Sequence, residues 1–230
     1  MSKMIKRVID LAIEIQQIPA PTFDEGQRAE FVRDLFIRES LTEVSVDASG
    51  NVFGCLRSNG HAKPLIVSAH LDTVFPRETN LQVRRENEKV YGPGIGDNSL
   101  GVAALFGLIW MLRERNIALG GDLWFVANVC EEGLGDLKGI KTVVDRFGSD
   151  VLAYLILEGL ALGHVYHRAV GVRRYRVTAR TSGGHSWSDY GKPSAVHELS
   201  KLVVQLAALT LPSQPRTTRK PPRGSRRLGV

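Results

Sequence analysis

The feature that most constrains the fold is a series of short apolar runs separated by helical patterns. The runs at 64–69, 123–127 and 151–157 have the length of strands and are apolar enough to be buried on both faces of a sheet. Between them, segments 99–115 and 137–147 carry apolar residues at helical spacing. Strands that alternate with helices predict an α/β domain with a mainly parallel central sheet.

The N-terminal part of the chain predicts two helices and a hairpin. Apolar residues at helical spacing from Ile5 to Ile13 predict a first helix, and Asp24 is expected to cap a second helix through residues 31–36. Segments 44–46 and 52–56, joined by a Gly-Asn turn, predict two strands of a hairpin.

The composition is that of an ordinary soluble globular protein, with 43% hydrophobic and 23% charged residues. The first ten residues mix charged and apolar groups, unlike a signal peptide, and no run is expected to be long enough to span a bilayer. We therefore predict a cytoplasmic protein without a membrane partner. Cys55 and Cys130 lie in apolar segments and lack C-x-x-C spacing, which predicts buried free thiols.

The net charge of +6 is concentrated at the end of the chain. Residues 212–230 contain six basic and no acidic residues, which leaves 24 basic and 24 acidic residues elsewhere. No aromatic residue lies among these basic residues to stack on bases, as single-strand binding sites require. Nucleic acid is therefore not the expected partner.

Acidic residues and a histidine stand where the predicted strands and their loops end. They are His70 and Asp72 after the first long strand, Asp97 in a glycine-rich loop, Glu131 and Glu132 after the second strand, and Glu158 after the third. The carboxyl ends of parallel strands meet at one edge of a sheet. These side chains therefore predict a metal site at that edge, since histidine and carboxylates are common metal ligands.

Each of these residues also has a simpler interpretation. A histidine after a strand is more often a hydrogen-bonded structural residue, Asp97 can cap the helix that begins near Ser99, and Glu131 and Glu132 can be a solvated loop pair. Adjacent carboxylates at the end of a buried strand repel each other unless a cation or a shared proton offsets the repulsion. A carboxylate two residues after a histidine can hold the imidazole in its metal-binding tautomer. The presence of such residues at the ends of several predicted strands favours the metal site.

Four motifs in this order resemble those of the M20 metallopeptidases. They are Ser-Ala-His-Leu-Asp-Thr at 68–73, Gly-Asp-Asn at 96–98, Glu-Glu-Gly at 131–133 and Glu-Gly at 158–159, and the resemblance covers about residues 10–211. It implies a three-layer, zinc-peptidase-like catalytic domain that holds two Zn²⁺ ions, or Co²⁺ or Mn²⁺ in their place. The implied roles are His70 and Glu158 on one ion, Glu132 on the second, Asp97 bridging both, Asp72 orienting His70, and Glu131 as general base.

The resemblance also implies a chemistry. In that family two ions activate a water, a carboxylate takes its proton, and an amide bond is cleaved in a small peptide or an N-acyl amino acid. The segment Glu-Glu-Gly-Leu-Gly-Asp-Leu at 131–137 is most similar to the peptidase T-like branch.

A lid domain, through which the family forms homodimers, is implied for residues 168–211. Its first strand is expected at 175–179 and its helix at 194–209, and the Ser-Gly-Gly-His-Ser motif at 182–186 matches the histidine that acts on the partner subunit's active site. His185 is therefore expected to bind the substrate carboxylate or the oxyanion in trans. Without the family, His185 is better interpreted as a polar turn residue. His164, His167 and His197 are expected to be structural or surface groups.

The expected domains are 1–167 as the catalytic domain, incomplete in its C-terminal part, 168–211 as the lid segment, and 212–230 as a basic, disordered tail. The family's returning segment, with a final histidine for the second zinc, is expected to be missing. The sequence changes character near Thr218, which suggests a shifted reading frame or a premature end. The sequence thus predicts a truncated hydrolase whose activity is in question. The alternative is a non-catalytic metal-binding or interaction remnant.

Overall fold

The computed structural model describes residues 3–159, 163–168, 172 and 174–210. The chain divides into two compact units, residues 1–162 and residues 163–230. Each unit is described by itself.

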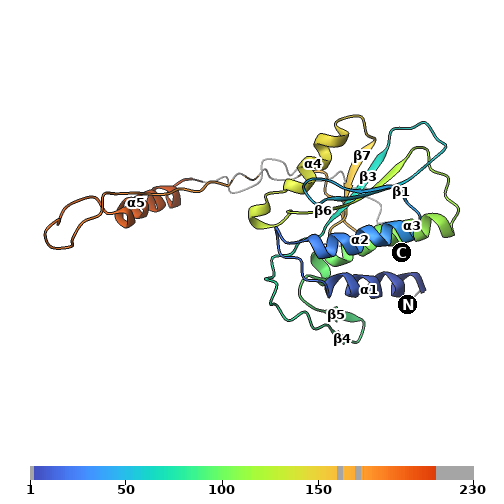
Figure 1. Cartoon of the computed structure of the whole chain (residues 1–230), viewed down its shortest axis with the longest axis horizontal. Helices are drawn as coiled ribbons and strands as arrows, with labels where there is room; N and C mark the ends of the chain where they lie inside the picture. The colour runs from blue at the N-terminus through green and yellow to red at the C-terminus, as the bar shows by residue number, and fades with distance from the viewer. Residues whose placement is uncertain (1–2, 160–162, 169–171, 173, 211–230) are drawn as a thin grey trace. The chain divides into compact units, whose positions relative to one another are not determined.

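The first unit is built on a five-stranded sheet in the order β1-β2-β6-β3-β7 (Figure 1). The strands are β1 (Thr42–Val46), β2 (Val52–Leu56), β3 (Leu65–His70), β6 (Leu123–Asn128) and β7 (Ala153–Ile156). Strand β3 lies between β6 and β7 and is parallel to both. The β1–β2 hairpin joins through an antiparallel pairing of β2 with β6. The predicted α/β fold with a parallel core is confirmed, and the predicted hairpin forms its antiparallel side.

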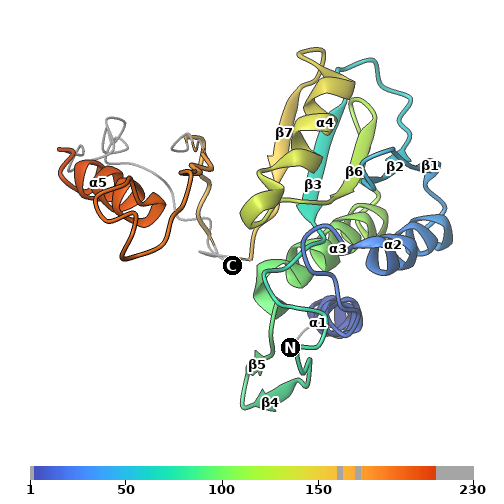
Figure 2. The same cartoon turned by 60° about the vertical axis from the view of Figure 1, so that its left-hand side comes forward.

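Helices cover both faces of this sheet (Figures 1 and 2). Helices α1 (Lys3–Gln16), α2 (Gly26–Arg38) and α3 (Leu100–Glu114) lie on one face, and α4 (Lys138–Phe147) lies on the other. Side chains of β3 alternate between the two cores: Val67 and Ala69 pack with α1 to α3, whereas Ile66 packs with Val143 of α4. The unit therefore has the three predicted layers.

Small elements connect these layers. Strands β4 (Arg84–Glu86) and β5 (Lys89–Tyr91) form a separate hairpin, and two short helical turns, η1 (Ile95–Ser99) and η2 (Gly133–Gly135), follow β5 and β6. The buried Gln16 side chain donates hydrogen bonds to the carbonyls of Leu81 and Pro93, at 3.1 and 2.9 Å. This residue therefore ties the loop that precedes η1 to helix α1.

The segment Ile95–Glu114 corrects one prediction. By length and composition it is apolar enough to cross a membrane, although no such run was expected from the sequence. Half of it is buried inside the unit, where Leu105, Phe106 and Ile109 of α3 belong to the core between helices and sheet. A central helix that is covered on several sides needs apolar residues around most of its circumference.

Helix α2 begins differently from the prediction. Its N-cap position is Glu25, and the Asp24 carboxylate accepts a hydrogen bond from Arg77 Nε at 2.7 Å instead of capping the helix. The expected cap at Asp24 is therefore wrong. The ion pair with Arg77, which is distant in sequence, draws the carboxylate away from the helix end.

Strand β7 is less buried than its sequence suggested. Leu155 and Ile156 are 41% and 46% exposed, because β7 is an edge strand of the sheet formed by the described residues. The prediction of burial on both faces is therefore wrong for this strand. Cys55 and Cys130 are both buried and free, as predicted.

In the second unit, α5 (Ala195–Ala207) follows Ser194 at its N-cap position and lies within the helix predicted at 194–209. Residues 175–179 do not form the predicted strand. A strand needs a hydrogen-bonded neighbour, and the described residues of this unit contain none. His164, His167 and His197 are exposed, in agreement with surface roles. The tail predicted at 212–230 lies outside the described residues.

Candidate metal site

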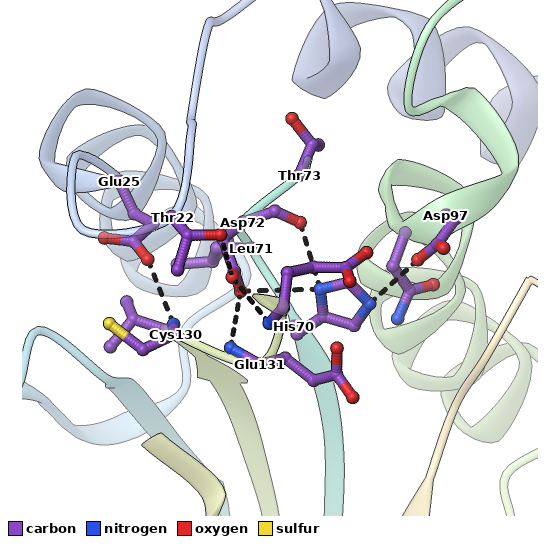
Figure 3. A network of polar contacts seen from close by, with 12 residues as sticks. Thr22, Glu25, His70, Leu71, Asp72, Thr73, Asp97, Cys130 and Glu131 are labelled. Carbon is purple, nitrogen blue, oxygen red and sulfur yellow. Dashed lines mark hydrogen bonds and ion pairs between the residues drawn. The ribbon is translucent and has the colours of Figure 1, made fainter. Parts of the chain in front are cut away.

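The predicted ligands of the first unit gather at the carboxyl edge of the parallel strands, and Figure 3 shows His70, Asp97 and Glu131 among them. His70 is the last residue of β3, Asp97 lies in η1, Glu131 and Glu132 follow β6, and Glu158 follows β7. Ligand atoms of His70, Asp97 and Glu158 all lie within 4.8 Å of one another, and so do those of His70, Glu131 and Glu132. His70 thus belongs to both groups.

The imidazole of His70 has its two nitrogens in different surroundings. Nδ1 is 3.0 Å from the main-chain carbonyl of Asp72 and 3.5 Å from the Asp72 carboxylate. Nε2 is 3.0 Å from Asp97 Oδ1 and 3.6 Å from Glu158 Oε1. A proton on Nδ1 that is donated to the carbonyl leaves Nε2 as the nitrogen that faces the other ligands.

Asp72 joins the loops that follow β3 and β6. Its carboxylate is fully buried, with Oδ1 accepting a hydrogen bond from the main-chain amide of Glu131 and Oδ2 accepting one from that of Glu132, both at 2.9 Å. Oδ2 also accepts a hydrogen bond from the hydroxyl of Thr22 at 2.9 Å. The carboxylate predicted to orient His70 therefore also holds the backbone of both glutamates.

The charges of the cluster perturb one another. Burial alone lowers the pKa of His70, but the hydrogen bond to Asp72 and the negative charges of Glu158, Asp72 and Glu131 outweigh burial and raise this pKa to about 9. Burial raises the pKa of Glu132, and the charges of Asp97 and Glu131 act in the same direction. Burial also raises the pKa of Glu158, against the opposing effect of His70. Bound cations would relieve this crowding of negative charge.

The predicted capping role of Asp97 belongs instead to its neighbour Asn98. The Asp97 carboxylate contacts His70, whereas Asn98 Oδ1 accepts a hydrogen bond from the amide of Gly101 at 3.0 Å. Asn98 Nδ2 donates to the carbonyl of Leu157 at 2.8 Å. This fully buried residue therefore links the loop of Asp97 to the end of β7, where Glu158 stands.

His185, the predicted residue of the second unit, is exposed. Its amide donates to Asp189 Oδ2 at 2.8 Å, and its Nδ1 accepts a hydrogen bond from the amide of Trp187 at 3.2 Å. Its role toward an active site stays a prediction.

Three residues near the site were missed from the sequence: Thr22, Glu25 and Arg28. Glu25 and Arg28 are 6% and 2% exposed and bind main-chain groups beside the site. Charged residues at the start of an amphipathic helix normally face solvent, so their types alone gave no signal. The interval from Thr22 to Glu25 at a helix start was the available clue.

An α/β sheet with histidine and carboxylates at the carboxyl ends of its parallel strands is the arrangement of a metal-binding α/β domain. Residues 66–223 match the family model described as "Peptidase family M20/M25/M40". The chain belongs to this family.

Relatives and solved structures agree with this assignment. Succinyl-diaminopimelate desuccinylase of Corynebacterium glutamicum is 29% identical over 201 residues, which are 87% of this chain and 54% of the relative. The chain thus spans about half the length of this curated relative. Aminopeptidase PepT from Bacillus cereus has a TM-score of 0.58 at 23% identity, covering 66% of this chain and 43% of its own. Human carnosine dipeptidase 1 has a TM-score of 0.54 at 18% identity, and the match covers 71% of this chain and 42% of the dipeptidase chain.

The structural likenesses support the fold of the first unit. The similarity to the peptidase T-like branch stays a prediction, because the structures below 25% identity report on the fold alone.

Proposed function

We propose that this chain forms the metal-binding part of a hydrolase that cleaves an amide bond in a small peptide or an N-acyl amino acid. The observation that carries the proposal is the convergence of His70, Asp97, Glu131, Glu132 and Glu158 on one edge of the sheet. Membership of a peptidase family supports the reaction class. The desuccinylase name of a relative supports an N-acyl substrate, and the dipeptidase name of a structural neighbour is consistent with amide cleavage.

The residues fit a pair of divalent ions, which we propose to be Zn²⁺, with Co²⁺ or Mn²⁺ as alternatives. His70 and Glu158 would hold one ion, Glu132 the other, and Asp97 would contact both. The fit rests on the short separations among their ligand atoms and on the upward pKa shifts of Glu132 and Glu158, which mark uncompensated negative charge. Such ions, when bound, polarise the scissile carbonyl and acidify a water.

We assign the role of general base to Glu131. Its main-chain amide is held by Asp72, and its half-buried side chain reaches the cluster around His70. The carboxylate of Glu131 takes a proton from the attacking water and delivers it to the leaving nitrogen. Glu132, one residue later, serves as a ligand. Two adjacent glutamates thus have different roles.

We also propose that His185 acts on the substrate carboxylate or the oxyanion within a homodimer. A polar, exposed histidine beside glycines suits contact with a ligand from another subunit. Among the described residues we assign only Asp97 and Glu132 to the second ion, and the family's final histidine would be its third protein ligand.

The test compares Glu131→Gln with Glu132→Gln. We expect Glu131→Gln to lower turnover of dipeptides and N-succinyl amino acids by roughly 100- to 10,000-fold while zinc content is retained. Glu132→Gln should lose zinc from one site. Glu88→Gln, an exposed glutamate in the β4–β5 hairpin, is the matched control and should change neither quantity.

Equal zinc loss in both variants would contradict the division of roles. Zinc binding with no turnover of any substrate in the panel would favour the alternative, a non-catalytic metal-binding protein.

A further inference from the structure

We propose that Thr22, Glu25 and Arg28 are positioning residues that set the geometry of the metal ligands. We call these three residues the bracket. They lie just before and in the first turn of α2. Figure 3 shows Thr22 and Glu25 on the far side of the strand-end loops from Asp97. The inference rests on the proposed metal-dependent function, and it assigns to the start of α2 a role in that site.

The first contact of the bracket is made by Thr22. Its hydroxyl donates a hydrogen bond to Asp72 Oδ2 at 2.9 Å, and Oδ2 also accepts a hydrogen bond from the main-chain amide of Glu132. Figure 3 shows Thr22 above the Asp72 carboxylate, with Glu131 on its other side. Thr22 is further anchored by its own amide, which donates to the carbonyl of Thr73 at 3.3 Å. The hydroxyl therefore fixes the one carboxylate that joins both ligand loops.

The second contact is made by Glu25 to the loop after β6. Its Oε1 accepts the amide of Cys130 at 3.0 Å and the amide of Phe23 at 3.1 Å. Cys130 immediately precedes Glu131 and has a φ of 52°, in the left-handed region that residues other than glycine rarely adopt. The buried carboxylate thus holds the backbone in an unfavourable conformation one residue before the proposed general base.

The third contact is made by Arg28 to the loop after β3. Nη1 donates to the carbonyl of Leu71 at 2.7 Å, between His70 and Asp72 in sequence. Nε and Nη2 donate to the carbonyl of Ile18, at 2.9 and 2.5 Å. The guanidinium therefore links the chain before α2 to the residue that separates the proposed ligand from its orienting carboxylate.

The chemistry of the bracket favours positioning over simple stabilisation. Glu25 and Arg28 lie one helical turn apart and are both buried, and the hydrogen bonds described for their side chains go to main-chain groups and not to each other. Burying two charges is costly, and an apolar pair at these positions would fill a core at lower cost. Instead, both charges are used on main-chain groups of Leu71 and Cys130, each adjacent to a site residue.

Together the three contacts fix the loop of His70 and the loop of Glu131 and Glu132 relative to each other. Outer-shell partners of this kind change metal affinity when they are removed, although they do not touch the metal. Loss of the bracket should therefore let the two loops move apart while the sheet beneath them stays intact.

The test compares Thr22→Val, which keeps the shape of the side chain but removes its hydroxyl, with Thr22→Ser, which keeps the hydroxyl. Two properties are measured on the full chain: Co²⁺ affinity with the visible absorption of bound Co²⁺, and amide hydrogen exchange in metal-free protein. We expect Thr22→Val to bind Co²⁺ about 10-fold more weakly with an altered spectrum. Hydrogen exchange at the amides of Glu131 and Glu132 should accelerate severalfold in Thr22→Val, while exchange at the amide of Phe125 in β6 stays unchanged. Thr22→Ser should keep the Co²⁺ affinity and the exchange rates of the parent protein.

A second pair guards against a variant that fails to fold. Glu25→Gln keeps an oxygen that can accept the amide of Cys130, whereas Glu25→Leu leaves that amide without its acceptor. Glu25→Gln should behave like the parent protein, and Glu25→Leu should accelerate exchange at Cys130 and weaken Co²⁺ binding.

The outcomes separate this inference from the proposed function. If the parent protein binds no Co²⁺, the proposed metal site is wrong, and the exchange data still decide the bracket. If the parent protein binds Co²⁺ and Thr22→Val matches it in both affinity and exchange, the positioning role is overturned.

Discussion

The two sides of the candidate metal site are built in different ways. His70 and Asp72 have side chains that are 2% and 0% exposed, and they are held by main-chain and hydroxyl groups from three segments. Asp97 and Glu158 are 52% and 40% exposed, and a buried residue, Asn98, links their loops by a hydrogen bond. One side is therefore part of the core, whereas the other faces solvent. Substitutions on the buried side should affect stability and metal binding together, and those on the open side should affect mainly metal binding.

The largest effect should come from Asp72→Asn compared with Glu158→Gln. An asparagine at position 72 places an N–H group toward a backbone donor, so we expect the free energy of unfolding to fall by about 3–5 kcal/mol. Glu158→Gln should change it by about 0.5 kcal/mol or less, because this side chain is partly exposed. Urea unfolding with a chelator present measures both values. Equal destabilisation by the two variants would remove the distinction between the sides.

The second prediction concerns pH and the buried side alone. In metal-free protein the pKa of His70 is raised from 6.5 to about 9, so the folded state binds this proton more tightly than the unfolded state does. The resulting stability is fully present below pH 6.5 and is lost as the pH rises through 9. The raised pKa values of Glu132 and Glu158 lower the stability as the pH rises above 4.5. The lowered pKa of Asp72 gives stability that is lost only in acid, below its ordinary pKa of 3.8.

We therefore expect the urea midpoint, measured with a chelator, to fall between pH 6.5 and 9. His61→Gln, at an exposed position, should retain this decrease, whereas His70→Gln should abolish it. A midpoint that is constant across this range would show that the imidazole is not held by the surrounding carboxylates.

The third prediction tests the hydrogen-bonded link that Asn98 makes on the open side. Asn98→Ala removes the bond to Leu157 and the cap on the amide of Gly101, and we expect it to cost about 1–3 kcal/mol. It should also weaken zinc binding, since the loops of Asp97 and Glu158 lose their connection. Isothermal titration with zinc, alongside urea unfolding, tests this, with Asn59→Ala at an exposed position after β2 as the control. Unchanged zinc affinity in Asn98→Ala would indicate that the open side is positioned in another way.

The smallest effect is expected at Ser68, inside β3 on the buried side. Its hydroxyl is buried and has no hydrogen-bond partner among the described residues. Ser68→Ala should therefore change the free energy of unfolding by less than about 1 kcal/mol, in the stabilising direction. Thermal unfolding measures it. A clear loss of stability would mean that this hydroxyl has a function that the contacts of β3 do not reveal.

The sequence predicted the buried side of the fold better than its edges. The apolar runs of β3 and β6 mark strands that are covered on both faces, and the residues that follow them meet as expected. The run at 151–157 has the same composition, but its strand β7 lies at an edge and is partly exposed. Composition reports what a strand can bury and not how many neighbours it has.

The clustering of the candidate ligands could be predicted because carboxylates after apolar strands are unusual. The residues that hold them could not, since Glu25 and Arg28 have the types and spacing of an exposed helix start. Asn98 was visible beside Asp97, yet only its bonds across to Leu157 distinguish a link from an ordinary cap. Long-range contacts of this kind leave no local pattern in the chain.

The strand order β2-β6-β3 has a consequence for how the protein is made. Strands β2 and β3 follow each other in the chain, but each is hydrogen-bonded to β6, which is synthesised after the whole of helix α3. A nascent chain that ends before residue 123 therefore has a hairpin and a lone strand with no shared sheet. The candidate ligands could come together only after β6 had entered the sheet between β2 and β3. This unit should therefore fold in one cooperative step, and only after β6 has been synthesised.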